Sequence, residues 1–423
     1  MKLIIAQYGT WRFSLSKFYL PLLLAGICIY LVMTRMLVCI LVYENRPVPY
    51  CNMYKYLGTN ITCNINYEKA NSRLVDAAGR SLGAITCKMI NGGFSYRIYS
   101  KLVEACVHSI SDYSGEVIGY KSYDESMKLY LRTARAFCGV SKSAPKPGII
   151  AEINWLLPVY RTQLKMVRQY YRLASFSNDR LSKKVFLWDK FLNNQKTVCT
   201  WNSEVRYIFE QNNLPGIYDN VLNYSLKNVI TNLRSQMLLK QQNDFKMQFC
   251  QFSKLDSLLH YKNFNETPAY LTLCLSFRER SVLSKARLGI LELRLETCRY
   301  MRPVLPREQR TCLVCPHPQP SQLVEDIYHF LFICKCYSDL RSVWLEKLVL
   351  SDEFFPLEMN QQLGEFLNHP SNVKPTARYI INCLDVRSLM IADMKDKSVY
   401  YHTDPPEYCV ACNADEQSCE TSV

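Results

Sequence analysis

The residues with the clearest capacity for chemistry are three cysteines and one histidine in the last third of the chain. Cys312 and Cys315 form a Cys-x2-Cys pair, and His329 and Cys334 follow after thirteen intervening residues as a His-x4-Cys pair. This spacing can place three thiolates and one imidazole around a tetrahedral zinc ion, with each sulfur at about 2.3 Å. Because four protein ligands leave no open coordination position, the pattern predicts one structural zinc ion and no catalytic one.

Two further residues are alternative ligands. Cys336 lies two residues after Cys334, and His317 lies in a loop stiffened by Pro316 and Pro318, which makes it the weaker choice. In a chain with 19 cysteines, an incidental arrangement of core residues is the competing explanation. A second pair, Cys409 and Cys412, lies in an acidic stretch with no helical pattern, for which we expect a disordered tail over 391–423.

The elements that must position these residues are predicted to be mainly helical. Residues 54–62 indicate a short strand and turn, after which apolar residues recur at helical spacing from about Tyr67. Leu82 and Met89 belong to the first apolar stripe, which ends at a Gly-Gly pair, and a third stripe ends at Gly139. The pattern predicts a mainly α fold, with a helical bundle followed by a helical domain that carries a small CCHC zinc knuckle.

The expected organisation has five parts. The expected ranges are an apolar N-terminal segment at 1–45, a helical domain at 46–195, a polar linker region at 196–270, a helical domain at 271–390 with the knuckle at 312–334, and the acidic tail at 391–423.

The N-terminal segment contains an almost wholly apolar run at 18–43, interrupted by Thr34 and Arg35. A bilayer-spanning helix needs about 20 apolar residues, so the run is long enough for a transmembrane signal-anchor. It is too long for a cleaved signal peptide, and no small-x-small cleavage site follows it. A stretch unrelated to the rest of the protein explains the run equally well.

A basic stripe is the second feature with a chemical meaning. Arg161, Lys165, Arg168 and Arg172 fall on one face of one expected helix, with tyrosines between them. Such a face can follow a phosphate backbone and stack on bases, although a solvated helix face is the simpler interpretation. The remaining candidate nucleic-acid contacts are Lys183, Lys184, Arg299, Arg302 and Arg310.

The composition is that of a globular protein with a polyanionic partner or a charged surface. The chain has 423 residues, of which 48% are hydrophobic and 21% charged, and its formal net charge is +14. This excludes a disordered or collagen-like chain, while the positive charge suits RNA, DNA or an anionic membrane. The cysteines are too sparse for a disulfide framework and fit a reducing compartment better.

With these residues in hand, a resemblance to a known family emerges. The stretch 280–341, including the run at 287–300 and the knuckle at 312–334, resembles the C-terminal zinc knuckle of non-LTR (LINE-type) retrotransposon reverse transcriptases. Residues 54–58 resemble the entry to that family's thumb, and 378–383 its final helix. The resemblance implies a thumb-like bundle and a knuckle that contact template RNA and target DNA.

The departures from that family bear on activity. A reverse transcriptase needs paired aspartates to hold two metal ions, and the chain contains no Asp-Asp pair. The fingers, palm and endonuclease of the family are missing, and no phosphate-binding loop or hydrolase motif occurs. We therefore expect a protein that is not an enzyme, has no small-molecule substrate and retains RNA or DNA binding.

Two alternatives stay open. The chain could be a single-pass membrane protein whose zinc-stabilised domain serves interactions, or a transposon relic without a selected function. The retroelement interpretation implies the nucleus or cytoplasm, whereas insertion of 18–43 implies a membrane. His108 lies on an apolar stripe and is expected to be a core residue.

Overall fold

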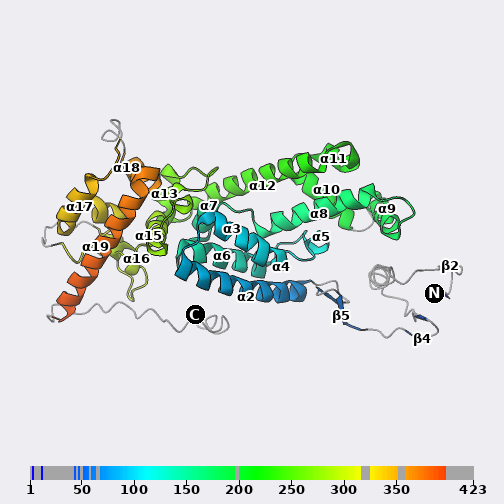
Figure 1. Ribbon diagram of the computed structural model, residues 1–423, viewed down its shortest axis with the longest axis horizontal. Coiled ribbons are helices and arrows are strands. Elements are labelled where there is room, and N and C mark those ends of the chain that lie inside the picture. Colours follow the sequence, from blue (N-terminus) through cyan, green and yellow to red (C-terminus); the bar gives the residue numbers. More distant parts are fainter. Residues whose placement is uncertain are drawn as a thin grey trace. The chain divides into compact units, whose positions relative to one another are not determined.

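The structure is a computed structural model that describes residues 2–3, 11–12, 42–43, 46–47, 51–56, 59–62, 67–195, 200–315, 324–350 and 358–396. Within these ranges the protein is mainly helical, which confirms the predicted fold class at that level. Figure 1 shows the helices and the few short strands. The apolar run at 18–43, His317 and the pair Cys409 and Cys412 lie outside the described residues.

The chain divides into two compact units, each assembled from separate segments. Unit 1 comprises Met1–Gly83, Glu104–Tyr130 and Leu157–Gln236, and unit 2 comprises Ala84–Val103, Leu131–Leu156 and Met237–Val423. The sequence predicts consecutive domains at 46–195 and 271–390. Each of the two units instead consists of three separate segments, and the segments of the two units alternate along the sequence. Periodicity along a sequence indicates helices but not which helices pack together, because packing depends on contacts between distant segments.

Unit 1 contains the strands and a set of helices around α8. Its strands form antiparallel pairs β1 with β2, β3 with β4, and β5 with β6. Its strands are β1 (Lys2–Leu3), β2 (Trp11–Arg12), β3 (Val42–Tyr43), β4 (Arg46–Pro47), β5 (Met53–Tyr56) and β6 (Thr59–Thr62). Its helices are η1 (Glu104–His108), α4 (Ser109–Ser111), α5 (Gly115–Ile118), α8 (Pro158–Ser175), α9 (Leu181–Asn194), α10 (Trp201–Gln211), α11 (Pro215–Asp219) and η2 (Val221–Asn223).

Unit 2 combines two complete helices from the first half of the chain with the helices of the C-terminal region. They are α3 (Tyr96–Val103), α7 (Lys146–Ile153), η3 (Ser253–Leu255), α13 (Asp256–Tyr261), α14 (Ala269–Thr272), α15 (Phe277–Arg287), α16 (Arg294–Thr297), η4 (Arg307–Gln309), η5 (His329–Ile333), η6 (Lys335–Tyr337), α17 (Ser338–Leu345), α18 (Met359–Asn368) and α19 (Pro370–Asp396). Three helices have residues in both units, namely α2 (Glu68–Gly92), α6 (Asp124–Cys138) and α12 (Leu226–Phe249).

Several helix ends follow from local sequence. Helix α2 ends at Gly92, and Gly93 takes a left-handed φ of 66°, which a glycine adopts without strain. Helix α6 ends at Cys138, and Gly139 has a φ of 64°. A Cβ at Gly139 would lie 2.7 Å from the Ser281 side chain, so this position requires glycine for space as well as for conformation. The sequence-predicted ends of these two helices are therefore confirmed.

The polar stretch 196–270, predicted as a linker region, contains α10, α11, α12 and α13 over most of its described length. Helix α10 starts with a capping box in which Thr200 and Ser203 satisfy each other's backbone N–H groups. Val205 and Phe209 of α10 and Leu233 of α12 are buried. A polar composition therefore does not distinguish a linker from helices that expose most of their surface, because a few apolar positions are enough to bury one face.

The core of unit 2 contains a fully buried ion pair. The guanidinium of Arg287 on α15 donates to both carboxylate oxygens of Glu152 on α7, at 2.7 and 2.9 Å, and neither side chain is exposed. Tyr261 and Tyr270 place their rings 5.3 and 5.1 Å from the Arg287 guanidinium carbon. This pair holds α7 and α15 together, and removal of one partner would leave an uncompensated buried charge.

Among the described residues, no helix is both long enough and apolar enough to cross a membrane.

Candidate metal centre

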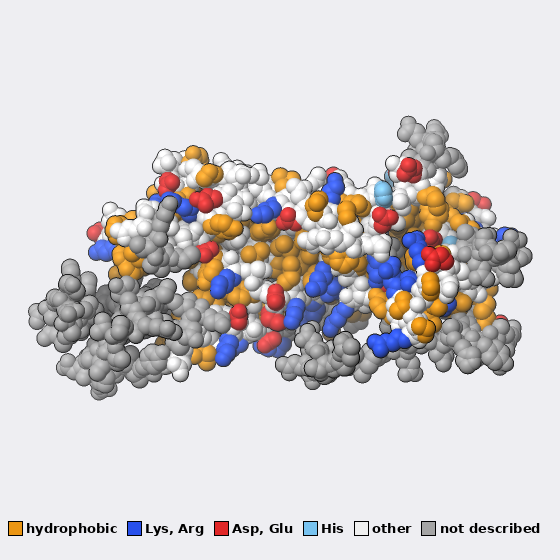
Figure 2. All heavy atoms as spheres, turned by 180° about the vertical axis from the view of Figure 1, so that it is seen from behind, with side chains coloured by type: hydrophobic (Ala, Val, Ile, Leu, Met, Phe, Trp, Pro, Cys, Tyr) orange, Lys and Arg blue, Asp and Glu red, His pale blue; other side chains and the backbone are white. Residues whose placement is uncertain are grey.

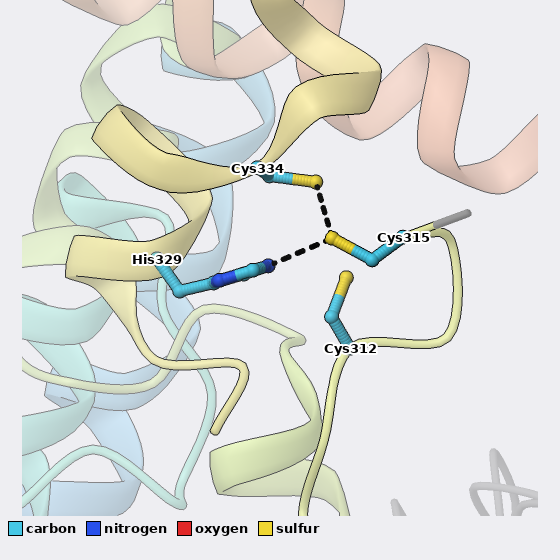
Figure 3. Close-up of side chains that lie close together, drawn as sticks. All are labelled: Cys312, Cys315, His329 and Cys334. Carbon is cyan, nitrogen blue, oxygen red and sulfur yellow. Dashed lines mark hydrogen bonds between the residues drawn. The ribbon is translucent and has the colours of Figure 1, made fainter. Parts of the chain in front are cut away.

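The four sequence-predicted ligands lie together in unit 2. One ligand atom from each of Cys312, Cys315, His329 and Cys334 lies within 4.8 Å of the others. The Cys315 sulfur is 3.4 Å from His329 Nε2 and 3.5 Å from the Cys334 sulfur, as Figure 3 shows. Ligand sulfurs about 2.3 Å from one tetrahedral ion stand roughly 3.8 Å apart. The cluster is therefore compact enough to hold a metal ion.

The loop that carries Cys312 and Cys315 is fixed at both sides. Thr311, directly before Cys312, forms an antiparallel bridge with Val324. The Cys336 thiol donates to the carbonyl oxygen of Val314 at 2.6 Å, and the Val314 side chain is buried. Cys336, the alternative ligand, thus contacts the backbone of the ligand loop and lies outside the four-atom group.

A short π-helical turn presents the other two ligands. The backbone N–H of His329 donates to Asp326 Oδ1 at 2.8 Å, and the N–H of Cys334 donates to the carbonyl of His329 at 2.8 Å. Phe330 and Leu331, between the ligands, are buried. The turn thereby directs its apolar side chains into the core and places His329 and Cys334 on the side of the loop, as drawn in Figure 3.

Arg341 of α17 supports the same turn from its C-terminal side. Its guanidinium donates to the carbonyl of Leu331 at 2.7 Å and to that of Cys334 at 2.6 Å. Tyr379 of α19 donates its hydroxyl to the Leu331 carbonyl at 2.9 Å. The ligand-bearing turn is therefore hydrogen-bonded to α17 and to α19.

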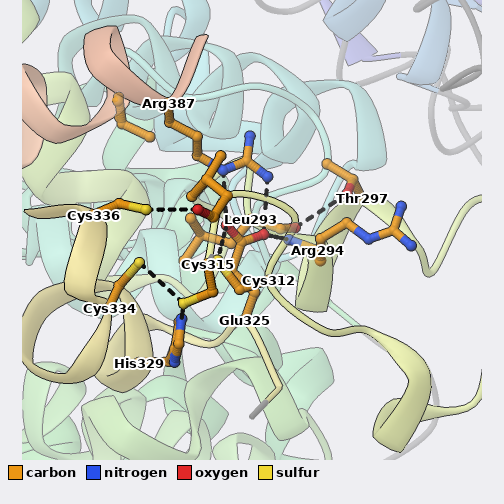
Figure 4. A network of polar contacts seen from close by, with 12 residues as sticks. Leu293, Arg294, Thr297, Cys312, Cys315, Glu325, His329, Cys334, Cys336 and Arg387 are labelled. Carbon is orange, nitrogen blue, oxygen red and sulfur yellow. Dashed lines mark hydrogen bonds and ion pairs between the residues drawn. The ribbon is translucent and has the colours of Figure 1, made fainter. Parts of the chain in front are cut away.

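A buried carboxylate lies beside the cluster. Glu325 accepts two hydrogen bonds from Arg387 of α19, at 2.8 and 2.9 Å, and one from the backbone N–H of Arg294 at 2.7 Å. The Cys312 thiol lies 3.7 Å from Glu325 Oε1, which Figure 4 shows together with the ion pair. Burial raises the pKa of the Glu325 carboxyl, and the Arg387 guanidinium opposes that shift. Glu325 is thus a positioning residue between the ligand loop and α19.

The crowding of the ligand atoms shifts their proton affinities in opposite directions. Hydrogen bonding from the Cys334 thiol, together with the His329 ring, lowers the pKa of Cys312. Hydrogen bonding to Cys312 raises the pKa of Cys334, and burial raises that of Cys315. Negative charge on one of these adjacent sulfurs opposes negative charge on the others. A cation at the centre would remove this mutual repulsion.

The donor set itself fits a particular class of ion. Three sulfurs and one imidazole nitrogen are soft or borderline ligands, which suit a tetrahedral thiolate-binding metal and not calcium or magnesium. His329 and Cys334 are buried, whereas Cys312 and Cys315 are partly exposed. All four ligand positions are filled by protein atoms, so the arrangement suits a structural ion with no position for a substrate.

The four residues of the predicted basic stripe on α8 have two different kinds of surroundings. The Arg161 guanidinium pairs with both carboxylate oxygens of Asp112 at 2.8 and 2.9 Å, and the Lys165 ammonium donates to the Asp112 carbonyl at 2.7 Å. Arg168 and Arg172 are exposed. The sequence predicts four equivalent contacts for a polyanion, whereas two of the four are used by the fold of unit 1.

The next two predicted contacts also differ from each other. Lys183 is buried, and its ammonium donates to the Ala174 carbonyl at 2.5 Å. Lys184, one residue on, is exposed. Adjacent residues on α9 lie about 100° apart around the helix, and here this rotation turns Lys183 toward the protein and Lys184 toward solvent.

The three arginines near the cluster have separate surroundings. Arg310 donates to the carbonyls of Leu305 and Leu295, at 2.9 and 3.1 Å, and so supports the loop before the ligands. Arg299 forms an ion pair with Glu296 at 3.3 Å. Arg302 is exposed. Figure 2 shows that lysines and arginines on the visible face form several groups separated by apolar and uncharged side chains, not one continuous patch.

Sequence reasoning gave no role to Glu325, Arg387 or Asp112. Glu325 and Arg387 are 62 positions apart. Asp112 lies 49 positions from Arg161. No local spacing connects such residues, and their pairing could be found only from the packed structure.

Comparison of the chain with protein-family models, with curated proteins and with solved structures finds no match in any of the three.

Proposed function

We propose that this protein is a non-catalytic nucleic-acid-binding protein, derived from a retrotransposon reverse transcriptase, whose C-terminal helical unit is closed by one structural zinc ion. The observation that carries the proposal is the convergence of Cys312, Cys315, His329 and Cys334 within 4.8 Å. These are the four positions that the resemblance to the LINE-type knuckle selects.

Zinc is the ion that the donor set supports best. Tetrahedral sites of three cysteines and one histidine are typical structural zinc sites, since zinc accepts both sulfur and nitrogen ligands without a redox requirement. The ion would hold the Cys312–Cys315 loop against the His329–Cys334 turn. Because Arg341 and Tyr379 contact this turn, and Arg387 pairs with Glu325 beside the loop, zinc binding would also stabilise α17 and α19.

The surface for nucleic acid is proposed at the end of α8 and the start of α9. Arg168, Arg172 and Lys184 are exposed, and none of them forms an ion pair within the described part of the chain. Phe176 lies between the helices, with the guanidinium carbons of Arg172 and Arg180 at 5.8 and 4.5 Å from its ring. Guanidinium groups held on an aromatic ring keep most of their N–H groups directed outward, where phosphate oxygens can accept them.

The test is binding of the full chain to 20-nucleotide RNA and DNA over a salt series. The triple variant Arg168→Ala, Arg172→Ala, Lys184→Ala should bind more weakly and flatten the salt slope by up to about 0.9 for each lost phosphate contact on duplex DNA. A matched control removes three exposed charges elsewhere, by Lys69→Ala, Lys227→Ala and Lys246→Ala.

The outcomes separate a local surface from general charge. A weaker interaction in the first variant alone supports the proposal. Equal losses in both triple variants would show that only the net charge of +14 matters. Absence of binding by the unmodified protein at low salt would overturn the nucleic-acid part and leave the metal centre to be tested by itself.

A further inference from the structure

Unit 2 contains a groove whose lining includes none of the four candidate metal ligands. It has a volume of about 570 Å³ and is bounded by residues 273–275 after α14, by α17 and by the first half of α19. Helices α17 and α19 lie side by side, as Figure 1 shows. A groove of this size falls in the range that accommodates bound side chains or small ligands.

The floor of the groove is aliphatic. Leu273, Leu340 and Val343 line it, and Val343 is 50% exposed. The aromatic residues in its wall have no free ring face: Trp344 stacks on Tyr379 at 4.3 Å and packs against Phe366 at 4.9 Å. Trp344 and Tyr379 are each only 3% exposed. The groove therefore offers aliphatic contacts but no aromatic surface on which a base could stack.

The rim of the groove is positively charged. Lys347 of the segment after α17 and Lys374 and Arg378 of α19 line it, and none of its lining residues is acidic. Arg378 pairs with Glu279 at 3.1 Å. For Lys347 and Lys374, no ion pair is present within the described ranges, and both side chains are exposed. Two ammonium groups thus flank an apolar floor without a carboxylate partner.

The walls of the groove are held in place before any partner arrives. The indole N–H of Trp344 donates to the Thr376 hydroxyl at 3.3 Å, which joins α17 to α19. The Asn372 side chain accepts from the Val349 N–H at 2.8 Å and donates to the Val349 carbonyl at 2.9 Å. A preformed groove binds a partner with less loss of conformational entropy than one that must first be ordered.

From this combination we propose that the groove docks an acidic amphipathic helical segment of a partner protein. Leucine-type side chains of the segment would occupy the floor formed by Leu273, Leu340 and Val343. Carboxylates on the flanks of the segment would pair with Lys347 and Lys374. The mode is that of a helix in a groove, in which apolar anchors give affinity and rim charges give orientation and selectivity. This function goes beyond nucleic-acid binding and uses different residues.

The experiment uses the full-length protein and a fluorescein-labelled synthetic 16-residue peptide that carries leucines at helical spacing and glutamates on both flanks. Fluorescence anisotropy measures its binding. One comparison peptide replaces each glutamate by glutamine, a second replaces each leucine by serine, and a 20-nucleotide poly(dT) represents a nucleic-acid occupant. We expect binding of the acidic leucine peptide, and at least about tenfold weaker binding of both comparison peptides.

Variants locate the binding in the groove. Lys347→Glu with Lys374→Glu, and separately Val343→Asp, should each weaken peptide binding by about tenfold or more. The control Lys227→Glu with Lys246→Glu makes the same change of charge at two exposed positions of α12 and should leave peptide binding within about twofold. All substituted side chains are exposed, and circular dichroism confirms that each variant is folded.

Three outcomes would overturn the proposal. They are absence of peptide binding to the unmodified protein, equal effects of the groove and control variants, and poly(dT) binding that depends on Lys347 and Lys374 while peptide binding does not. Nucleic-acid binding through Arg168, Arg172 and Lys184 should be retained in the groove variants, so failure of one proposal is distinguishable from failure of the other.

Discussion

The metal-ligand cluster and the basic stripe of α8 both consist of residues chosen by spacing, but the fold treats them differently. At the cluster, Cys312, Cys315, His329 and Cys334 all converge. On α8, Arg161 and Lys165 contact Asp112, while Arg168 and Arg172 are exposed.

The difference has a physical cause. A metal site needs four soft ligands in a small volume, and few residue types and spacings satisfy that requirement. A cation on a helix face has many partners available, including carboxylates and carbonyls of its own fold. Spacing is therefore much stronger evidence for a ligand set than for a polyanion-binding surface.

The largest expected effect comes from loss of the metal centre. Cys334→Ser, at a buried ligand position, should reduce bound zinc from about one ion per chain to near zero. The variant and the chelated protein should both be less stable by several kcal/mol, since structural zinc contributes roughly 10–16 kcal/mol in small modules. Elemental analysis and thermal unfolding measure the two effects.

Cys250→Ser is the matched control, because Cys250 is exposed and is not among the four ligands. It should keep its zinc and its melting temperature. Retention of one zinc ion by Cys334→Ser would contradict the role of Cys334 as a required ligand. It would show that another donor, such as Cys336, can complete the site.

The next effect concerns the carboxylate beside the ligands. Glu325→Gln leaves the buried Arg387 guanidinium without its charge partner, which should cost about 3–5 kcal/mol of unfolding free energy. It should also weaken zinc binding by roughly 10–100-fold, as changes around a metal site commonly do. Denaturant unfolding and competition with a chelating dye measure these quantities.

The control for that prediction is a substitution in an exposed ion pair, between Asp385 and Arg278. Asp385→Asn removes an exposed pair and should change stability by no more than about 1 kcal/mol. Equal losses in Glu325→Gln and Asp385→Asn would contradict the positioning role of Glu325.

The third prediction compares two residues of the basic stripe, Arg161 and Arg168. Arg161→Ala should lower the free energy of unfolding by about 1–3 kcal/mol, because the buried Asp112 carboxylate loses two of its three hydrogen bonds and keeps only that from the Ser111 hydroxyl. Arg168→Ala, at an exposed position of the same helix, should leave stability within about 0.5 kcal/mol and instead weaken nucleic-acid binding. Chemical denaturation and oligonucleotide binding of the two single variants provide the measurement. If Arg161→Ala instead weakened nucleic-acid binding and Arg168→Ala instead lowered stability, Arg161 would be the residue that contacts nucleic acid.

The last effect, which is smallest near neutral pH and grows as the pH falls, is a dependence of stability on pH. Burial, reinforced by Arg161, lowers the pKa of His108 from 6.5 to about 3, so the folded protein keeps this ring neutral while the unfolded chain takes up a proton below about pH 6.5. Stability should therefore fall as the pH decreases from about 6.5 toward 3, by at most about 1.4 kcal/mol per pH unit from this residue. Asp112, with its pKa lowered by Arg161 against the opposing effect of burial, adds a further loss only below about pH 4.

His108→Gln should flatten the decline between about pH 6.5 and 3 in denaturant titrations and leave only the further loss due to Asp112 below about pH 4. The same slope in the variant and the unmodified protein would show that another group is responsible.

Much of the local structure could be predicted. Apolar positions such as Leu82 and Met89 are buried at the predicted helical spacing, and Gly93 and Gly139 follow the ends of their helices with positive φ. These features depend on residues within a few positions of one another, where periodicity and the conformational freedom of glycine act directly.

By itself, the sequence determined the helical character of the chain, the ends of several helices and the four residues that converge at the candidate metal centre, because each depends on short-range spacing. The tertiary structure alone decided which charges the fold uses, pairing Glu325 with Arg387 and Asp112 with Arg161 across long stretches of chain. It also assembled each unit from interleaved segments, and it formed helices in the polar stretch 196–270. The physical reason is that a charge or a polar helix acquires its role from the neighbours that packing brings to it, and those neighbours are not encoded in local spacing.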